Sequence, residues 1–159
     1  MKMKITFILA FISIFVSAAS VLAQGGMSAE KPPIFVPSVD LKWTDLDPTG
    51  APGVKVADLW GDHKTGKFGA LFKLPAGFAV PLHTHTYDMK VVFVSGTYIQ
   101  APEGKPEIRL GPGSYMMQPG GNYRHTTSCD PASDCVFFVE SDGPFDLKAA
   151  AAEKASASK

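Results

Sequence analysis

Three of the four histidines in this sequence have types and spacing that suit a metal ion. His83 and His85 are separated by one residue, and His125 lies much later in the chain. Residues i and i+2 of a β-strand point to the same face, so both imidazoles could bind one ion at nitrogen–metal distances of about 2.0–2.1 Å. A later strand could bring His125 beside them. The alternative for His83 and His85 is a pair of surface histidines on a polar strand edge.

The elements that would position these histidines are short apolar runs separated by glycine and proline. The runs cover 54–60, 68–74, 79–83, 89–94, 97–100, 108–110, 114–118, 123–128 and 136–141. Short runs at this spacing, each ended by turn residues, are typical of a β-sandwich or β-barrel. No window before the C-terminal tail shows the apolar period of a helix. The sequence therefore predicts an all-β domain.

Two segments resemble the paired signatures of the cupin superfamily. The first runs from Gly77 through the His-X-His of residues 83 and 85 to Gly96, and the second runs from Gly113 through Pro119-Gly-Gly121 to His125. The resemblance implies a double-stranded β-helix (a jelly-roll barrel), placed here at residues 54–148. It also implies one divalent transition metal bound by His83, His85 and His125. The metal could be Zn, Fe, Mn or Cu, and the resemblance identifies no catalytic residue.

The sequence departs from the cupin pattern at two positions. Met89 stands where the family has a glutamate ligand, and strand parity places it on the same face as His83 and His85. A thioether is a soft, weak ligand that suits copper better than the other metals. The fourth ligand could be Met89 itself, Asp88 reaching inward through a bulge, or water. Met89 could instead be an apolar wall of the pocket. One extra residue before His125 predicts a second bulge.

Other residues have expected roles in or away from the site. His63 lies in a polar turn at residues 61–66, and we expect it to be exposed. Aromatic and methionine side chains are ordinary core residues of a barrel as well as candidates for a pocket lining. The candidates for the lining are Phe72, Phe93, Tyr98, Tyr115, Met116, Met117, Gln118 and Tyr123.

The N-terminal residues resemble a secretory signal peptide. Two lysines precede an apolar stretch at residues 5–16, and small residues end at Ala23, so we expect residues 1–23 to be removed. The mature protein would be periplasmic or secreted, with no stable membrane anchor. In an exported chain, Cys129 and Cys135 are expected to form a disulfide. Residues 24–53 are expected to form an extended arm and residues 149–159 a flexible tail.

Charge and composition narrow the partners. The chain has 15 basic and 15 acidic residues, and loss of Lys2 and Lys4 leaves 13 against 15, a net charge of −2. Such a balance gives no basic surface for nucleic acid or for an anionic membrane. We therefore expect a small-molecule ligand or substrate and no nucleic acid, and a homodimer stays open.

The chain also resembles, more weakly, the zinc-binding cupin domain of anti-sigma factors of the ChrR type. The similarity is carried by residues 59–62, 74–78, 96–97 and 137–140, together with 143–145. Three functions follow. The first is a small-molecule metalloenzyme of the oxygenase, isomerase or lyase type, and the second is a non-catalytic module that binds or senses a ligand or metal. The third is a barrel without metal. Export argues against a sigma-factor partner.

Overall fold

The computed structural model describes residues 31–150, and its contacts divide the chain between Ile34 and Phe35. Residues 31–34 form no helix or strand, and all the strands belong to the second unit. The signal peptide expected at residues 1–23 lies outside the described residues. Within residues 31–150, no helix is long and apolar enough to cross a membrane.

Eleven strands and one short 3-10 helix make up the described chain, which contains no α-helix. In chain order they are η1 (Ser38–Asp40), β1 (Thr44–Asp47), β2 (Ala51–Gly61), β3 (Phe68–Leu74), β4 (Ala79–Thr84), β5 (Met89–Ser95), β6 (Tyr98–Pro102), β7 (Ile108–Leu110), β8 (Tyr115–Gln118), β9 (His125–Cys129), β10 (Cys135–Ser141) and β11 (Lys148–Ala149). These bounds follow the apolar runs of the sequence closely, because glycine and proline interrupt the strands at the turns.

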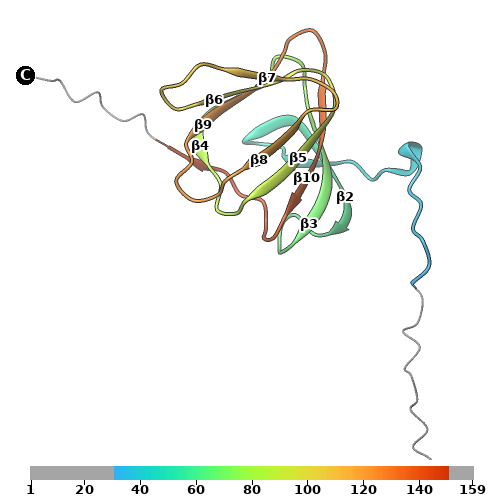
Figure 1. The fold of residues 1–159 in the computed structure, drawn as a ribbon. Coiled ribbons are helices and arrows are strands. Elements are labelled where there is room, and N and C mark those ends of the chain that lie inside the picture. The colour runs from blue at the N-terminus through green and yellow to red at the C-terminus, as the bar shows by residue number, and fades with distance from the viewer. Residues whose placement is uncertain (1–30, 151–159) are drawn as a thin grey trace, which may run out of the picture. The chain divides into compact units, whose positions relative to one another are not determined.

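The strands form two antiparallel sheets that face each other around the core (Figure 1). The six-stranded sheet has the order β1-β2-β3-β10-β5-β8, and the five-stranded sheet has the order β11-β4-β9-β6-β7. Strands that are distant in sequence are therefore neighbours in space, as in the β10–β3 and β10–β5 pairs. This arrangement is the two-sheet barrel that the sequence predicts.

Apolar side chains between the two sheets form the core. Every second side chain of a strand points into the core, and β10 shows this clearly, since its residues alternate between buried and half-buried along its whole length. Phe72, Phe93 and Phe137 pack there, with the rings of Phe72 and Phe137 stacked at 5.9 Å. Glycine is required at Gly96, where φ is +74° and a Cβ atom would lie 2.3 Å from the Asp134 carbonyl oxygen. The last glycine of the first cupin signature therefore permits a tight turn.

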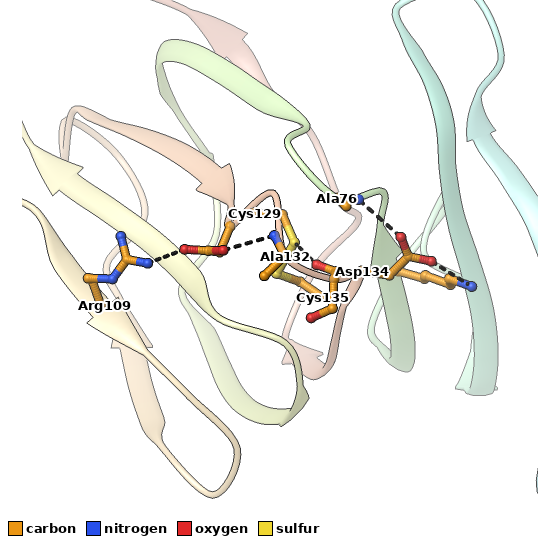
Figure 2. Close-up of a disulfide and its surroundings, with 9 residues drawn as sticks. Ala76, Arg109, Cys129, Ala132, Asp134 and Cys135 are labelled. Carbon is orange, nitrogen blue, oxygen red and sulfur yellow. Dashed lines mark hydrogen bonds and ion pairs between the residues drawn. A yellow bond between two sulfur atoms is a disulfide. The ribbon is translucent and has the colours of Figure 1, made fainter.

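The predicted disulfide is confirmed, and it joins β9 to β10 at one end of the barrel (Figure 2). The Cα atoms of Cys129 and Cys135 lie 5.8 Å apart. Asp134, inside the closed loop, accepts a hydrogen bond from the Ala76 amide at 3.0 Å and pairs with Lys73 at 3.0 Å. The loop is thus fastened to β3 and to the turn that follows it.

The flanking segments differ in part from the expectation of an arm at residues 24–53. Residues 44–47 and 51–53 belong to β1 and β2, because β1 pairs with β2 across a short turn in which Asp47 accepts the Thr49 and Gly50 amides. Of the arm expected at residues 24–53, the part that is described and forms no strand is therefore residues 31–43. At the other end Ala149 belongs to β11, whereas residues 24–30 and 151–159 lie outside the described part of the chain.

Candidate metal centre

The fold brings His83, His85 and His125 together inside the barrel. His83 and His125 are direct cross-strand partners in β4 and β9, and His85 follows the end of β4. The Gly121 amide donates to the His85 carbonyl at 2.8 Å, which joins the turn of the second signature to the first. The three side chains are 2%, 6% and 0% exposed, and one ring nitrogen of each lies within 4.8 Å of the others.

Backbone carbonyl groups orient all three imidazoles. The Nδ1 atom of His83 donates to the Pro81 oxygen at 2.7 Å, that of His85 to the Asp146 oxygen at 2.5 Å, and that of His125 to the Tyr123 oxygen at 3.3 Å. A carbonyl oxygen only accepts, so each Nδ1 carries the proton and each Nε2 keeps a lone pair. The Nε2 atom of His125 is buried and has no partner among the described residues.

Burial keeps these imidazoles neutral. It lowers the pKa of His85 to about 4 and that of His125 to about 4, and it also lowers the pKa of His83. Neutral imidazole is the form that binds metal, and a backbone partner on the second ring nitrogen is the usual support for a ligating histidine. Three such nitrogens with an unpaired, buried Nε2 among them fit a divalent transition ion.

The two side chains considered at the glutamate position, Met89 and Asp88, lie in different places. Met89 is 6% exposed and lines the same pocket as His83 and His85, as predicted. The predicted reason was wrong, because Met89 begins β5 in the six-stranded sheet and is not on the same strand as His83. Asp88 is exposed and its carboxylate accepts the Gly120 amide at 2.7 Å. The bulge that would turn Asp88 inward is absent, because β5 pairs with β8 in regular register from Met89 onward. Asp88 therefore points away from the three histidines.

The extra residue before His125 does not produce the expected bulge within a strand. Residues 121–122 form a turn with Gly121 at φ +74°, and β9 begins only at His125. The turn absorbs the additional residue. Gly120 is required in the same turn, since a Cβ atom there would lie 2.4 Å from the Thr86 carbonyl oxygen.

A mostly apolar pocket of about 90 Å³ lies beside the histidines. Of the expected lining residues, Phe72, Tyr98, Met116 and Gln118 contribute to it. The prediction was wrong for Tyr115 and Met117, which are 60% and 53% exposed. Alternation along β8 turns residues 116 and 118 inward and residues 115 and 117 outward. Phe93 packs in the core beside Tyr98, and Tyr123 stacks on His125.

A C-terminal segment, residues 143–149, also forms part of the site, and the sequence analysis did not predict this contribution. The ring of Phe145 lies 5.4 Å from that of His85 and 5.1 Å from that of Phe72. The Asp146 backbone orients His85, and Ala149 pairs with His83 through β11. Its proline and glycine gave no strand signal, so only the contacts that it makes across the chain identify it.

His63 is not the exposed loop residue that its polar neighbours suggested. It is 4% exposed, because Phe68 packs edge-on against its ring and the Phe145 amide donates to its carbonyl at 2.7 Å. Its Nδ1 lies 2.9 Å from an Asp58 carboxylate oxygen. The carboxylate of Asp62 lies close to both Asp58 and His63. It accepts hydrogen bonds from the Lys64 amide and the Thr65 hydroxyl within the turn. Here a carboxylate, and not a carbonyl, holds the imidazole.

Comparison with known proteins identifies the family. A profile described as "Domain of unknown function (DUF4437)" matches residues 33–153, which is most of the chain. The chain belongs to this family. The family is cupin-like, in agreement with both signatures and with the two-sheet barrel. No curated protein matches the sequence.

Solved structures share the fold at low sequence identity. The polyketide cyclase RemF from Streptomyces resistomycificus is 17% identical, with a TM-score of 0.63 over 77% of this chain and 89% of its own. KdgF from Halomonas sp. is 21% identical, with a TM-score of 0.53 over 69% of this chain and 94% of its own. The complex of SigE with the anti-sigma factor ChrR from Rhodobacter sphaeroides is 23% identical, with a TM-score of 0.51 over 67% of this chain and 51% of that one. These similarities establish the cupin fold.

Proposed function

We propose that His83, His85 and His125 bind one divalent transition metal and that the adjoining pocket binds a small molecule for metal-assisted chemistry of the lyase, isomerase or oxygenase type. The observation that carries the proposal is the set of three buried, neutral imidazoles whose Nδ1 atoms are all held by backbone carbonyls. Such a set leaves three lone pairs directed away from the protein's own hydrogen bonds. Three imidazoles without other ligands would leave coordination positions open for a ligand.

The residues around the histidines indicate the kind of molecule that would bind. Phe72, Phe145 and Met116 give the pocket an apolar wall, whereas Tyr98 and Thr127 bring hydroxyl groups. Those hydroxyl oxygens lie 2.9 Å apart and bond to each other, so they are partly satisfied already. A metal bound here would polarise an oxygen atom of the ligand or lower the pKa of a bound water. The chain would contribute orientation and the exclusion of bulk water.

A non-catalytic binding or sensing module is the second candidate. It is favoured by Met89, because the ligand position that iron and manganese cupin enzymes usually fill with a carboxylate holds a thioether. The fold similarity to the ChrR complex is compatible with this candidate. The two candidates agree on the metal and differ only in whether the bound small molecule is changed.

Metal analysis of the full chain, purified without chelator, tests the proposal. We expect about one equivalent of a transition metal, and loss of that metal in His83→Ala, His85→Ala and His125→Ala. His63→Gln is the matched control, because it alters the fourth histidine of the chain and should keep the metal. Full metal content in the His83→Ala/His85→Ala double variant would contradict the assignment. Mass spectrometry of small molecules before and after incubation then separates enzyme from binding module.

We also propose that the protein acts outside the cytoplasm, in the periplasm or after secretion. The Cys129–Cys135 disulfide supports this, because such bonds persist in oxidising compartments. Fractionation of cells expressing the full chain, with the N-terminus of the soluble form sequenced, checks it. We expect the first residue to be Gln24. A protein found only in the cytoplasm, with Met1 retained, would contradict export.

A further inference from the structure

Gln118 is a buried polar residue in the pocket to which neither the signatures nor the fold assigns a role. Its side chain is 2% exposed, and its Oε1 atom has no hydrogen-bond partner. A buried acceptor without a partner costs about 1–3 kcal/mol, so such groups are rare unless something else satisfies them. Within residues 31–150 no protein group does so, which indicates a ligand outside the chain.

Gln118 lines the same pocket as two of the three histidines. It is the cross-strand partner of Met89 in the β5–β8 pair, and partners opposite each other project to the same face. Both residues line the pocket together with His83 and His85. The neighbouring contacts hold this register, since Gly120 donates to Asp88 and Gly121 donates to the His85 carbonyl.

The chemistry of the pocket explains what an amide oxygen could do there. The three imidazoles supply only nitrogen, and Met89 supplies only a soft sulfur. An amide oxygen is a harder ligand, of the kind that suits Zn, Mn or Fe(II) better than a thioether does. Gln118 carries this oxygen on the strand next to the position at which a glutamate is missing.

We propose that the Oε1 atom of Gln118 is the oxygen ligand of the metal, replacing from β8 the carboxylate that β5 lacks at Met89. This inference rests on the proposed function of the three histidines. It gives a site of three nitrogens and one neutral oxygen. An ion of octahedral preference would then keep two positions for a small molecule, one of which an oxygen-bearing substrate could occupy.

Two variants of similar size in the same pocket test the inference: Gln118→Leu and Met89→Leu. Zinc affinity is measured by competition with a chromophoric chelator. Gln118→Leu should weaken zinc binding about tenfold or more, whereas Met89→Leu should leave it unchanged. Cobalt(II) serves as a spectroscopic probe, and its visible absorption should change in Gln118→Leu only. Equal zinc affinity in Gln118→Leu and wild type, or a loss confined to Met89→Leu, would overturn the assignment.

Stability without metal separates a ligand from a merely structural glutamine. Leucine removes an unsatisfied acceptor from an apolar wall, so metal-free Gln118→Leu should melt at or above the temperature of metal-free wild type. A lower melting temperature would instead show that Gln118 supports the fold. The proposed function fails separately, and recognisably, if wild type itself binds no zinc. If wild type binds zinc and Gln118→Leu binds it equally well, only the present inference fails.

Discussion

Two histidine environments in this barrel differ in one chemical detail, the group that holds Nδ1. In the inner group, formed by His83, His85 and His125, backbone carbonyls accept the Nδ1 protons and the rings stay neutral. In the outer pair, formed by Asp58 and His63, a carboxylate takes that place at 2.9 Å. A carbonyl can only accept a hydrogen bond from the ring and adds no charge, whereas a carboxylate places an acidic group beside it. Equally buried histidines thus have a backbone carbonyl as partner in the inner group and an acidic side chain as partner in the outer pair.

Acidification should have the largest effect, and it should act through the inner group. Burial lowers the pKa of His85 and of His125 to about 4, against 6.5 for a free histidine. Between these values the unfolded chain binds more protons than the folded chain. The stability is therefore complete above pH 6.5 and is lost as the pH falls toward 4. With about 1.4 kcal/mol per pKa unit, the loss is on the order of several kcal/mol.

Denaturant unfolding of metal-free protein, in steps from about pH 7 to about pH 4.5, measures this loss. The matched variant is His85→Gln, which should show a clearly shallower dependence on pH because it removes one of the three histidines whose pKa burial lowers. An unchanged dependence in that variant would show that the loss of stability at low pH does not come from the inner group.

Introducing a carboxylate beside the inner group should have the next largest effect, on how strongly zinc stabilises the protein. Met89→Glu places an anion beside three imidazoles, so zinc should stabilise this variant more than wild type, by about 1.4 kcal/mol or more if affinity rises tenfold. Without zinc the variant should be less stable than wild type, since the carboxylate is buried unpaired. Thermal melts with and without zinc measure both effects. Met117→Glu, on the exposed face of β8 opposite Lys90, is the control, and its stability relative to wild type should be the same with and without zinc.

Removing the disulfide should have an intermediate effect that leaves the inner group intact. A short closed loop contributes about 2 kcal/mol in the chain-entropy description, so Cys129→Ser/Cys135→Ser should lower the free energy of unfolding by that amount. Metal content should not change, because His125 is held by β4 at the opposite end of β9. Loss of zinc together with the disulfide would show that the two ends of β9 are coupled.

The smallest effect is expected in the outer pair. Asp58→Asn removes the charge that faces His63 but keeps a hydrogen-bond acceptor, and Asp58 is partly exposed, so the loss should be about 1 kcal/mol or less. Zinc binding should stay as in wild type. Asp62→Asn provides the comparison, because that carboxylate is bound within its own turn. A loss of zinc in Asp58→Asn would mean that the outer pair belongs to the metal site.

The sequence predicted those parts of the molecule that depend on local pattern. Alternation and turn residues gave the strands, the spacing of His83 and His85 gave a shared face, and two cysteines in a short loop gave the disulfide. The signatures added His125, which no local pattern joins to the others. The structure brings all three together.

The parts that could not be predicted depend on contacts between distant segments. The polar turn around His63 is buried only because Phe68 and Phe145 cover it. Parity within β8 decides that Gln118 faces the pocket and Met117 faces solvent, and the sequence does not fix that parity, since residues 115–117 are all apolar. The Asp146 carbonyl is a backbone group, and no side-chain pattern marks it as the partner of His85.

The pairing of residues 148–149 with β4 has a consequence for how the protein matures. β4, which carries His83, pairs with β9 on one side and gains its second neighbouring strand only from residues 148–149, near the end of the described chain. His85 gains its backbone partner only from Asp146. During synthesis, His85 is therefore made long before the backbone group that orients it. Metal binding adds to the free energy of folding. An ion bound by the three histidines would therefore stabilise only those chains in which residues 146–149 have docked. Metal acquisition would in this way act as a late checkpoint on completed folding.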